Sequence, residues 1–103
     1  MRLEIAAPAR IDLRKIWQYV AEDNPKAATR LLRRIEARFK MFSRQPLIGE
    51  PCFDLGDGIR RHSFGNYVIY YRPTDDAVHI LHVLHGARDI QQIQFPDSES
   101  ERT

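Results

Sequence analysis

The sequence predicts a small α+β domain in the order β-α-α-β-β-β, with an antiparallel helical hairpin packed on a small, mostly antiparallel sheet. Three observations predict it. Apolar residues recur at helical spacing over residues 8–44, two β-rich runs flank a Gly-Asn pair, and residues 77–85 form a long apolar run. The chain has 103 residues, 43% of them hydrophobic and 29% charged, which suits one globular domain. We expect that domain to span residues 1–95, followed by a polar, frayed tail at residues 96–103.

The N-terminal half predicts one strand and two helices. Residues 2–6 alternate between apolar and polar side chains, which is typical of a short strand. Apolar residues then recur at helical spacing over residues 8–22, behind a proline that suits a first helical turn. Asn24 is placed to cap a second helix that begins at Pro25 and ends near Arg44. Because the link is very short, we expect an antiparallel hairpin.

The C-terminal half predicts a loop followed by three strands. Residues 45–58 hold two prolines and three glycines, so we expect a loop. The β-rich runs on either side of residues 65–66 predict a hairpin, because glycine accepts the positive φ of a II′ or I′ turn. After a turn at residues 73–76, residues 77–85 are apolar on both faces and predict a central strand. Beyond that strand we expect a short helix or an extended tail to cover Ile90, Ile93 and Phe95.

Several polar side chains on the first two of these strands are candidates for binding. Arg60 shares a face with His62, while Arg61 takes the opposite face. Arg60 suits a phosphate or a carboxylate of a partner, or it is an edge charge that prevents aggregation. Tyrosines beside arginines can stack on bases, but they more often fill cores, and we expect Tyr70 or Tyr71 to be a core residue.

Three histidines lie on the long apolar strand. Strict alternation places His79 and His85 on one face with Leu81 and Val83, and His82 on the other. His79 and His85 are about 20 Å apart along such a strand, so they cannot share a metal ion, and we expect no metal site. We expect His82 to be a hydrogen-bonded histidine of the core or of an interface.

The segment after this strand gathers ionisable groups. His85 is followed by Gly86, which permits a sharp bend, and then by Arg88 and Asp89. The cluster has three interpretations. His85 is a general acid or base with Arg88 on a phosphate, or the cluster is a recognition edge, or Asp89 pairs with an arginine and holds the tail to the sheet.

Charge is distributed unevenly along the chain. Residues 1–72 carry fourteen Lys and Arg against eight Asp and Glu, whereas residues 73–103 carry two against six. A cationic surface suits nucleic acid, the ribosome or an acidic protein segment, and the alternative is a solvated helix face. Cys52 is the single cysteine, so no internal disulfide forms, which suits a reducing compartment. No apolar run approaches the length of a membrane span, and we expect a cytoplasmic protein.

Four segments together resemble a known superfamily. They are APARIDLRKIWQYVAEDNPKAATRLLRRIEARF, QPLIGEP, IRRHSFGNYVIYYRP and VHILHVLHGARD, and in this order and spacing they resemble the RelE/ParE toxins of bacterial toxin–antitoxin modules. The resemblance covers residues 3–95. It implies a small α+β toxin made with an antitoxin that is encoded beside it, wraps it and represses the shared operon by binding DNA.

The superfamily divides by target. RelE-like members are ribosome-dependent mRNA endoribonucleases, and ParE-like members act on DNA gyrase. YVIYYR and VLHGARD are typical of the ParE branch. The ribonucleases usually carry an arginine just after the hairpin turn, and here that position is Tyr67, which supplies no permanent positive charge for the scissile phosphate.

The resemblance therefore implies a ParE-like inhibitor of DNA gyrase, with no catalysed reaction and no cofactor, in a hetero-oligomer with its antitoxin and without a membrane partner. The alternative is a RelE-like mRNA endoribonuclease with Arg60, His85 and Arg88 as active groups. A third interpretation is a relative that has lost its target and only binds a partner. In the first case we expect six residues to contact the target or the antitoxin: Arg60, Arg61, Tyr71, Arg72, His85 and Arg88.

Overall fold

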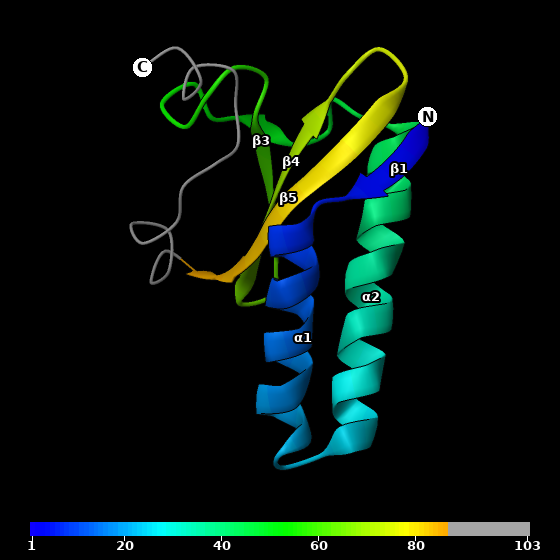
Figure 1. Cartoon of the computed structure of the whole chain (residues 1–103), viewed down its shortest axis with the longest axis vertical. Coiled ribbons are helices and arrows are strands. Elements are labelled where there is room, and N and C mark those ends of the chain that lie inside the picture. Colours follow the sequence, from blue (N-terminus) through cyan, green and yellow to red (C-terminus); the bar gives the residue numbers. More distant parts are fainter. Residues whose placement is uncertain (87–103) are drawn as a thin grey trace.

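The computed structural model describes residues 1–86 and contains two helices and one five-stranded sheet. In chain order the elements are β1 (Arg2–Ile5), α1 (Ala7–Ala21), α2 (Pro25–Arg44), β2 (Glu50–Pro51), β3 (Arg60–Phe64), β4 (Tyr67–Pro73) and β5 (Ala77–His85). The strand order in the sheet is β1-β5-β4-β3-β2, with β1 parallel to β5 and the other neighbours antiparallel. The predicted α+β class is confirmed, and Figure 1 shows the helical hairpin extending beyond the sheet. The expected helix or tail after Gly86, with Ile90, Ile93 and Phe95, lies outside the described residues, as does the predicted boundary at residue 95.

The helical hairpin forms as its local sequence predicts. The Asn24 side chain accepts a hydrogen bond from the Ala27 N–H at 3.1 Å and so satisfies a free donor in the first turn of α2. Near the far end of the hairpin, Trp17 Nε1 donates to Thr29 Oγ1 at 3.2 Å and links the two helices. No helix within residues 1–86 has both the length and the apolar character that a bilayer-crossing segment needs.

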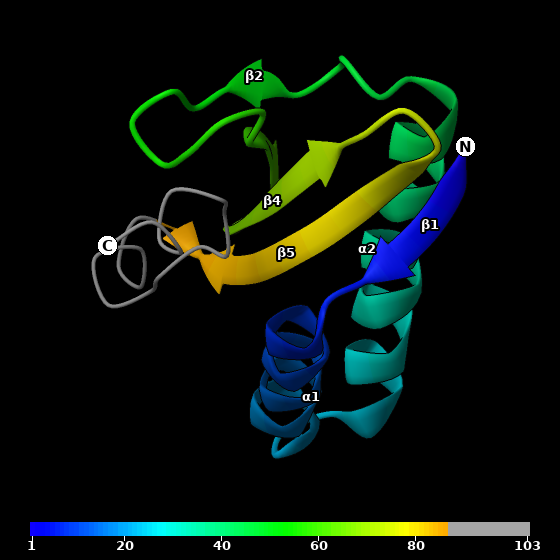
Figure 2. The same cartoon turned by 45° about the horizontal axis from the view of Figure 1, so that its top comes forward.

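The predicted loop at residues 45–58 contains a short strand, so that part of the prediction is wrong. Glu50 and Pro51 form β2, which pairs with Arg61 and Arg60 of β3. Figure 2 shows β2 as a short arrow in the segment that follows α2. Because glycine and proline are typical of loops, the composition of this segment does not indicate a strand. A proline fits there because β2 lies at the edge of the sheet, where a missing N–H is tolerated.

The predicted hairpin at residues 65–66 is confirmed. Phe64 faces Tyr67 across a two-residue turn, and Gly65 has φ of +58°. Asn66 has no positive φ, which makes the turn II′-like rather than I′.

β5 lies between β1 and β4, as expected of a strand that is apolar on both faces, but its alternation is interrupted. The register with β4 shifts so that Tyr70 faces His82 while Tyr71 faces Ile80, which leaves Leu81 as an extra residue. Leu81 and Val83 consequently belong to different clusters, and the predicted placement of both on one face is wrong. A bulge cannot be read from periodicity, because it adds a residue without any compositional signal.

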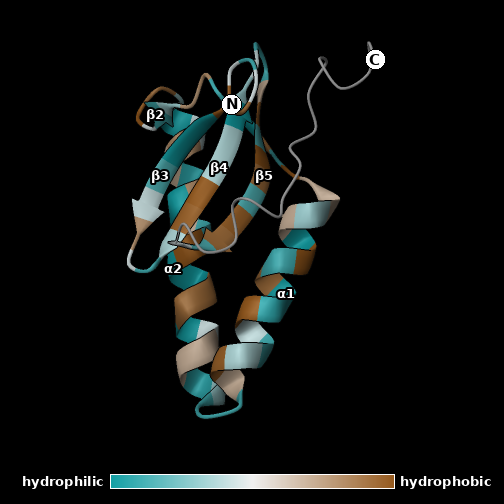
Figure 3. Ribbon diagram, turned by 90° about the vertical axis from the view of Figure 1, so that its left-hand side faces the viewer, coloured by the Kyte–Doolittle hydropathy of each residue, from teal (hydrophilic) through white to brown (hydrophobic). Residues whose placement is uncertain are grey.

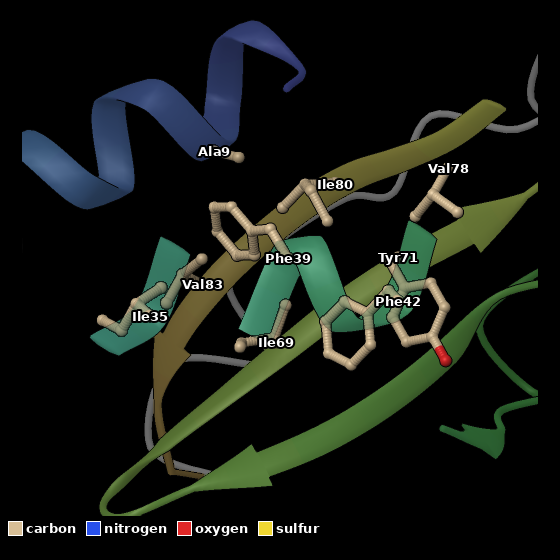
Figure 4. Close-up of a cluster of buried hydrophobic side chains, with 9 residues drawn as sticks. All are labelled: Ala9, Ile35, Phe39, Phe42, Ile69, Tyr71, Val78, Ile80 and Val83. Atoms are coloured by element: carbon tan, nitrogen blue, oxygen red, sulfur yellow. The ribbon is translucent and has the colours of Figure 1, made fainter. Parts of the chain in front are cut away.

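Two apolar clusters hold the fold together, one on each face of the sheet. The cluster on the helix side joins α1, α2 and the central strands (Figure 4), and consists of Ala9, Ile35, Phe39, Phe42, Ile69, Tyr71, Val78, Ile80 and Val83. The smaller cluster on the opposite face consists of Cys52, Ile59, Tyr70, Leu81 and Leu84. Both Tyr70 and Tyr71 are buried, which confirms the expected core tyrosine, and Tyr71 stacks on Phe42 at 4.2 Å between ring centroids.

Candidate functional site

The first feature of the site is a sheet edge that lies against a helix. β1 pairs only with the first part of β5, from Ala77 to Ile80. The Ala6 N–H donates to the Ile80 carbonyl at 2.9 Å, and α1 begins at the next residue. Within residues 1–86, no strand pairs with this edge of β5 beyond Ile80. α1 lies beside this edge (Figure 1), and its side chains meet the strand there.

Asp12 of α1 is the main polar contact between the helix and this edge. Its Oδ2 accepts the Val83 N–H at 3.0 Å and lies 2.8 Å from Nδ1 of His82. The side chains of Asp12 and His82 are only 14% and 6% exposed. The expectation of a hydrogen-bonded core histidine is therefore confirmed. Sequence analysis missed Asp12, although a carboxylate three residues after buried Ala9 is a signal of a buried partner.

A pocket of about 330 Å³ opens between α1 and this part of β5. We call it the α1–β5 groove. The residues that line it are Asp12, Lys15, Ile16, Tyr19, Tyr67, Val83, Leu84 and His85. Tyr19 is 76% exposed at its rim, and the rings of Tyr67 and His85 meet edge to face at 5.4 Å. The groove combines apolar surface with one lysine, which suits an amphipathic protein segment with a carboxylate.

Two predicted binding residues, Arg60 and Tyr71, hold the loop between α2 and β2. Arg60 Nη1 donates to the carbonyls of Leu47 at 3.2 Å and Gly49 at 2.6 Å. The Tyr71 hydroxyl accepts the Gly49 N–H at 2.7 Å and donates to the Pro46 carbonyl at 2.9 Å. Burial raises the pKa of Tyr71, so this hydroxyl keeps the proton that it donates. Both side chains therefore have structural partners in the loop.

Arg61 and Arg72, also predicted to bind a partner, lie on the sheet face opposite the helices. Arg61 Nη2 forms an ion pair with Glu50 Oε1 at 2.8 Å, across the pairing of β2 with β3. Arg72 Nε donates to the Asp57 carbonyl at 2.9 Å and so supports the loop between β2 and β3.

Two of the three candidate nuclease groups, Arg60 and His85, lie far apart. Arg60 is the cross-strand neighbour of Tyr71, and His85 is the neighbour of Tyr67, on the opposite side of β4. Tyr67 and Tyr71 are four residues apart, or about 13 Å along a strand, and two strand spacings add to that distance. The third candidate, Arg88, and its neighbour Asp89 lie outside the described residues.

A histidine–arginine contact on the helix side of β3 was not predicted. Arg38 Nη1 lies 2.9 Å from Nε2 of His62, and the Arg38 guanidinium lies over the Phe64 ring at 5.0 Å. Burial and then the nearby Arg38 charge lower the pKa of His62, so its neutral ring accepts from the arginine. Within residues 1–86, no three His, Cys, Asp or Glu side chains are grouped to hold a metal ion.

Comparisons with known proteins identify relatives of this chain. A family model described as the ParE toxin of the type II toxin–antitoxin system parDE matches residues 3–90. Toxin ParE1 of Caulobacter vibrioides is 33% identical over 78 residues, which cover 75% of this chain and 80% of that protein. Toxin ParE3 of the same organism is 33% identical over 84 residues, which cover 81% and 84%.

Solved structures of toxin–antitoxin systems share the fold. A chain of the chromosomal ParDE system from P. aeruginosa matches with a TM-score of 0.71 at 21% identity, over 84% of this chain and 96% of that one. A chain of the RelBE2 toxin–antitoxin complex from Mycobacterium tuberculosis matches with a TM-score of 0.57 at 28% identity, over 82% and 95%. On the match of the family model and the two Caulobacter relatives, this chain belongs to the ParE family of toxins from type II toxin–antitoxin systems.

Proposed function

We propose that this chain inhibits DNA gyrase by binding it, without catalysing a reaction, and that a cognate antitoxin neutralises it. Membership of the ParE family supports gyrase as the target. The observation that carries the non-catalytic assignment is the separation of Arg60 from His85 on opposite sides of β4. General acid–base catalysis on a phosphate needs charged and proton-transferring groups around one atom, and these two side chains do not converge.

We propose that a segment of the antitoxin fills the α1–β5 groove. An amphipathic segment can bury apolar side chains against Ile16, Tyr19 and Leu84 and place a carboxylate near Lys15. Charge favours this occupant, because Lys15 is the one permanently cationic residue that residues 1–86 contribute to the lining, and Asp12 is already bonded to His82. The structural relatives come from toxin–antitoxin systems, which supports a partner of this kind.

Gyrase inhibition is tested with purified components. Adding the chain to gyrase and relaxed plasmid is expected to reduce supercoiling, and one equivalent of the product of the adjacent antitoxin gene should restore it. A type I topoisomerase relaxing the same plasmid serves as control and should be unaffected. Undiminished supercoiling, together with cleavage of mRNA in a translation extract, would instead support the ribonuclease alternative.

His85→Ala separates binding from catalysis. A general acid or base contributes about 10²–10⁴-fold to a rate, so its loss would abolish toxicity in cells that lack the antitoxin. For a non-catalytic inhibitor we expect a loss below tenfold, measured as the inducer concentration that halts growth. A loss of a hundredfold or more, with the fold retained by circular dichroism and with mRNA cleavage that the variant also loses, would contradict the proposal.

The groove is tested with a matched pair of exposed aromatic residues. Tyr19 lines the groove and is 76% exposed, whereas Phe53, in the loop after β2, is 88% exposed and does not line it. Tyr19→Asp is expected to weaken the affinity for the antitoxin at least tenfold by calorimetry, and Phe53→Asp by less than twofold. If both substitutions weaken antitoxin binding equally, the antitoxin does not bind in the groove. The conclusion from the gyrase assay does not depend on this result.

A further inference from the structure

The outward side of α2 carries a row of cations that the α1–β5 groove does not include. Positions 26, 30, 33, 40 and 44 fall on one side of a helix with 3.6 residues per turn, with Ala37 in the gap between them. We call this row the α2 ridge, and it consists of Lys26, Arg30, Arg33, Lys40 and Arg44, all exposed. Figure 3 shows hydrophilic residues recurring along the whole length of α2.

These cations are not neutralised within the described chain. Between residues 1 and 86, the ion pairs involve Arg2, Arg61 and His82 but no member of the α2 ridge. Glu36 is the single acidic residue of α2. Lys26 also stands in the first turn, where the helix dipole disfavours a positive charge and where α2 has no acidic residue. Like charges three or four residues apart destabilise a helix, so the row acts against the stability of α2.

The α2 ridge has no exposed large hydrophobic residue beside it on the helix, and this restricts the kind of partner that it can bind. Among residues 1–86, the exposed large hydrophobic residues are Met1, Ile11, Trp17, Tyr19, Leu47, Ile48 and Phe53, and none of them lies on α2. Protein interfaces need an apolar centre with few charges, and single-stranded nucleic acid is bound by stacking on aromatic side chains. A duplex backbone needs neither, because phosphate contacts alone hold it.

We propose that the α2 ridge binds the phosphate backbone of duplex DNA without reading its sequence. From Lys26 to Arg44 the ridge extends about 27 Å at 1.5 Å per residue, which is close to the length of one duplex turn of about 34 Å and lets the cations reach phosphates on both sides of a groove. Part of this length lies on the end of the hairpin that projects past the sheet (Figure 1), where a duplex meets no other element of the described chain. The inference goes beyond the proposed inhibition of gyrase and does not depend on the groove.

The test compares two triple variants that change net charge equally. Arg30→Gln/Arg33→Gln/Lys40→Gln removes the middle of the ridge, and Arg2→Gln/Arg10→Gln/Arg14→Gln removes three cations elsewhere. Binding of the purified chain to a fluorescent 30-base-pair duplex of arbitrary sequence is measured by anisotropy between low and physiological salt. Each phosphate contact contributes about −0.9 to the slope of log K against log salt, so the ridge triple should make the slope shallower by about 2.7. The control triple should change it by less than one.

Several outcomes would overturn the proposal. Among them are absence of duplex binding by the unaltered chain even at low salt, equal loss in the two triples, and tighter binding to polyglutamate or to an RNA hairpin than to the duplex. The ridge triple is expected to keep or raise the melting temperature, because glutamine is a good helix former and like charges are removed. If the melting temperature falls, the lost binding could be caused by unfolding. The single variant Arg33→Gln then tests the proposal, with an expected change of about 0.9 in the slope of log K against log salt.

Discussion

The carboxylate of Asp12 lies 2.8 Å from Nδ1 of His82, although 70 residues separate the two in the chain. The same oxygen accepts the Val83 N–H at 3.0 Å. One side chain of α1 thus satisfies two polar groups on β5 where no strand of the described chain continues the sheet. This contact fixes α1 against β5 at the wall of the α1–β5 groove.

Asp12→Ala is expected to lower the free energy of unfolding by about 2–3 kcal/mol, because it leaves a buried imidazole and a strand N–H without their acceptor. Urea titration followed by circular dichroism measures the change. Asp23→Ala, at an exposed acidic residue of the interhelical turn, is the control and should change stability by less than about 0.5 kcal/mol. Equal effects of the two substitutions would contradict a structural role for Asp12.

Tyr71→Phe removes a hydroxyl that bonds to both Gly49 and Pro46 while keeping the buried ring. We expect a loss of about 1–2 kcal/mol and faster proteolytic cleavage between α2 and β2, because the loop loses two attachments. Tyr19→Phe is the matched control, since Tyr19 is 76% exposed, and it should be neutral. Unchanged cleavage of Tyr71→Phe would show that the hydroxyl does not hold the loop.

Gly49→Ala is expected to destabilise the chain for a steric reason alone. A methyl group at this position would lie 2.5 Å from Tyr71 Oη and 2.7 Å from Tyr71 Cε1, while the backbone of Gly49 has no positive φ. Overpacking of this kind lowers the free energy of unfolding by about 1–3 kcal/mol. Because both substitutions act on the same contact, the double variant with Tyr71→Phe should cost less than the sum of the single variants. Additive costs in a double-mutant cycle would contradict this geometry.

His62 is expected to reduce stability at acidic pH. Its pKa is lowered in the folded chain by burial and by Arg38, so the unfolded chain takes up a proton first as the pH falls below the ordinary value of 6.5. Protonation of the unfolded state then favours unfolding until the pH reaches the lowered folded pKa. His62→Gln should therefore lose less stability than the unaltered chain between pH 7.5 and pH 5.5, measured by urea midpoints. Parallel losses would show that His62 titrates alike in both states.

Local features could be predicted from the sequence, because neighbouring residues decide them. The Asn24 cap depends on an N–H three residues away, and the turn at Gly65 depends on a φ that favours glycine. The helical hairpin, the β3–β4 hairpin and the central position of β5 follow from periodicities that span a few turns or strands. The resemblance to ParE toxins was also carried by the order of such segments, and the family match over residues 3–90 confirms it.

The roles of the candidate site residues were decided by tertiary structure. Arg60 and Tyr71, which the sequence predicts to bind a partner, also hold the α2–β2 loop, and which loop meets which strand is not encoded locally. The bulge at Leu81 changes which residues of β5 lie on each face. Asp12 contacts His82 because β1 ends at Ile5 and α1 then lies along the edge of β5 that no strand of residues 1–86 pairs with. Patterns among neighbouring residues predict both helices, the β3–β4 hairpin, the central strand β5 and the family, but not β2. The chain topology sets which polar groups bond to other segments and which, like the α2 ridge, stay exposed, because hydrogen bonds between distant segments depend on how the elements are arranged rather than on sequence spacing.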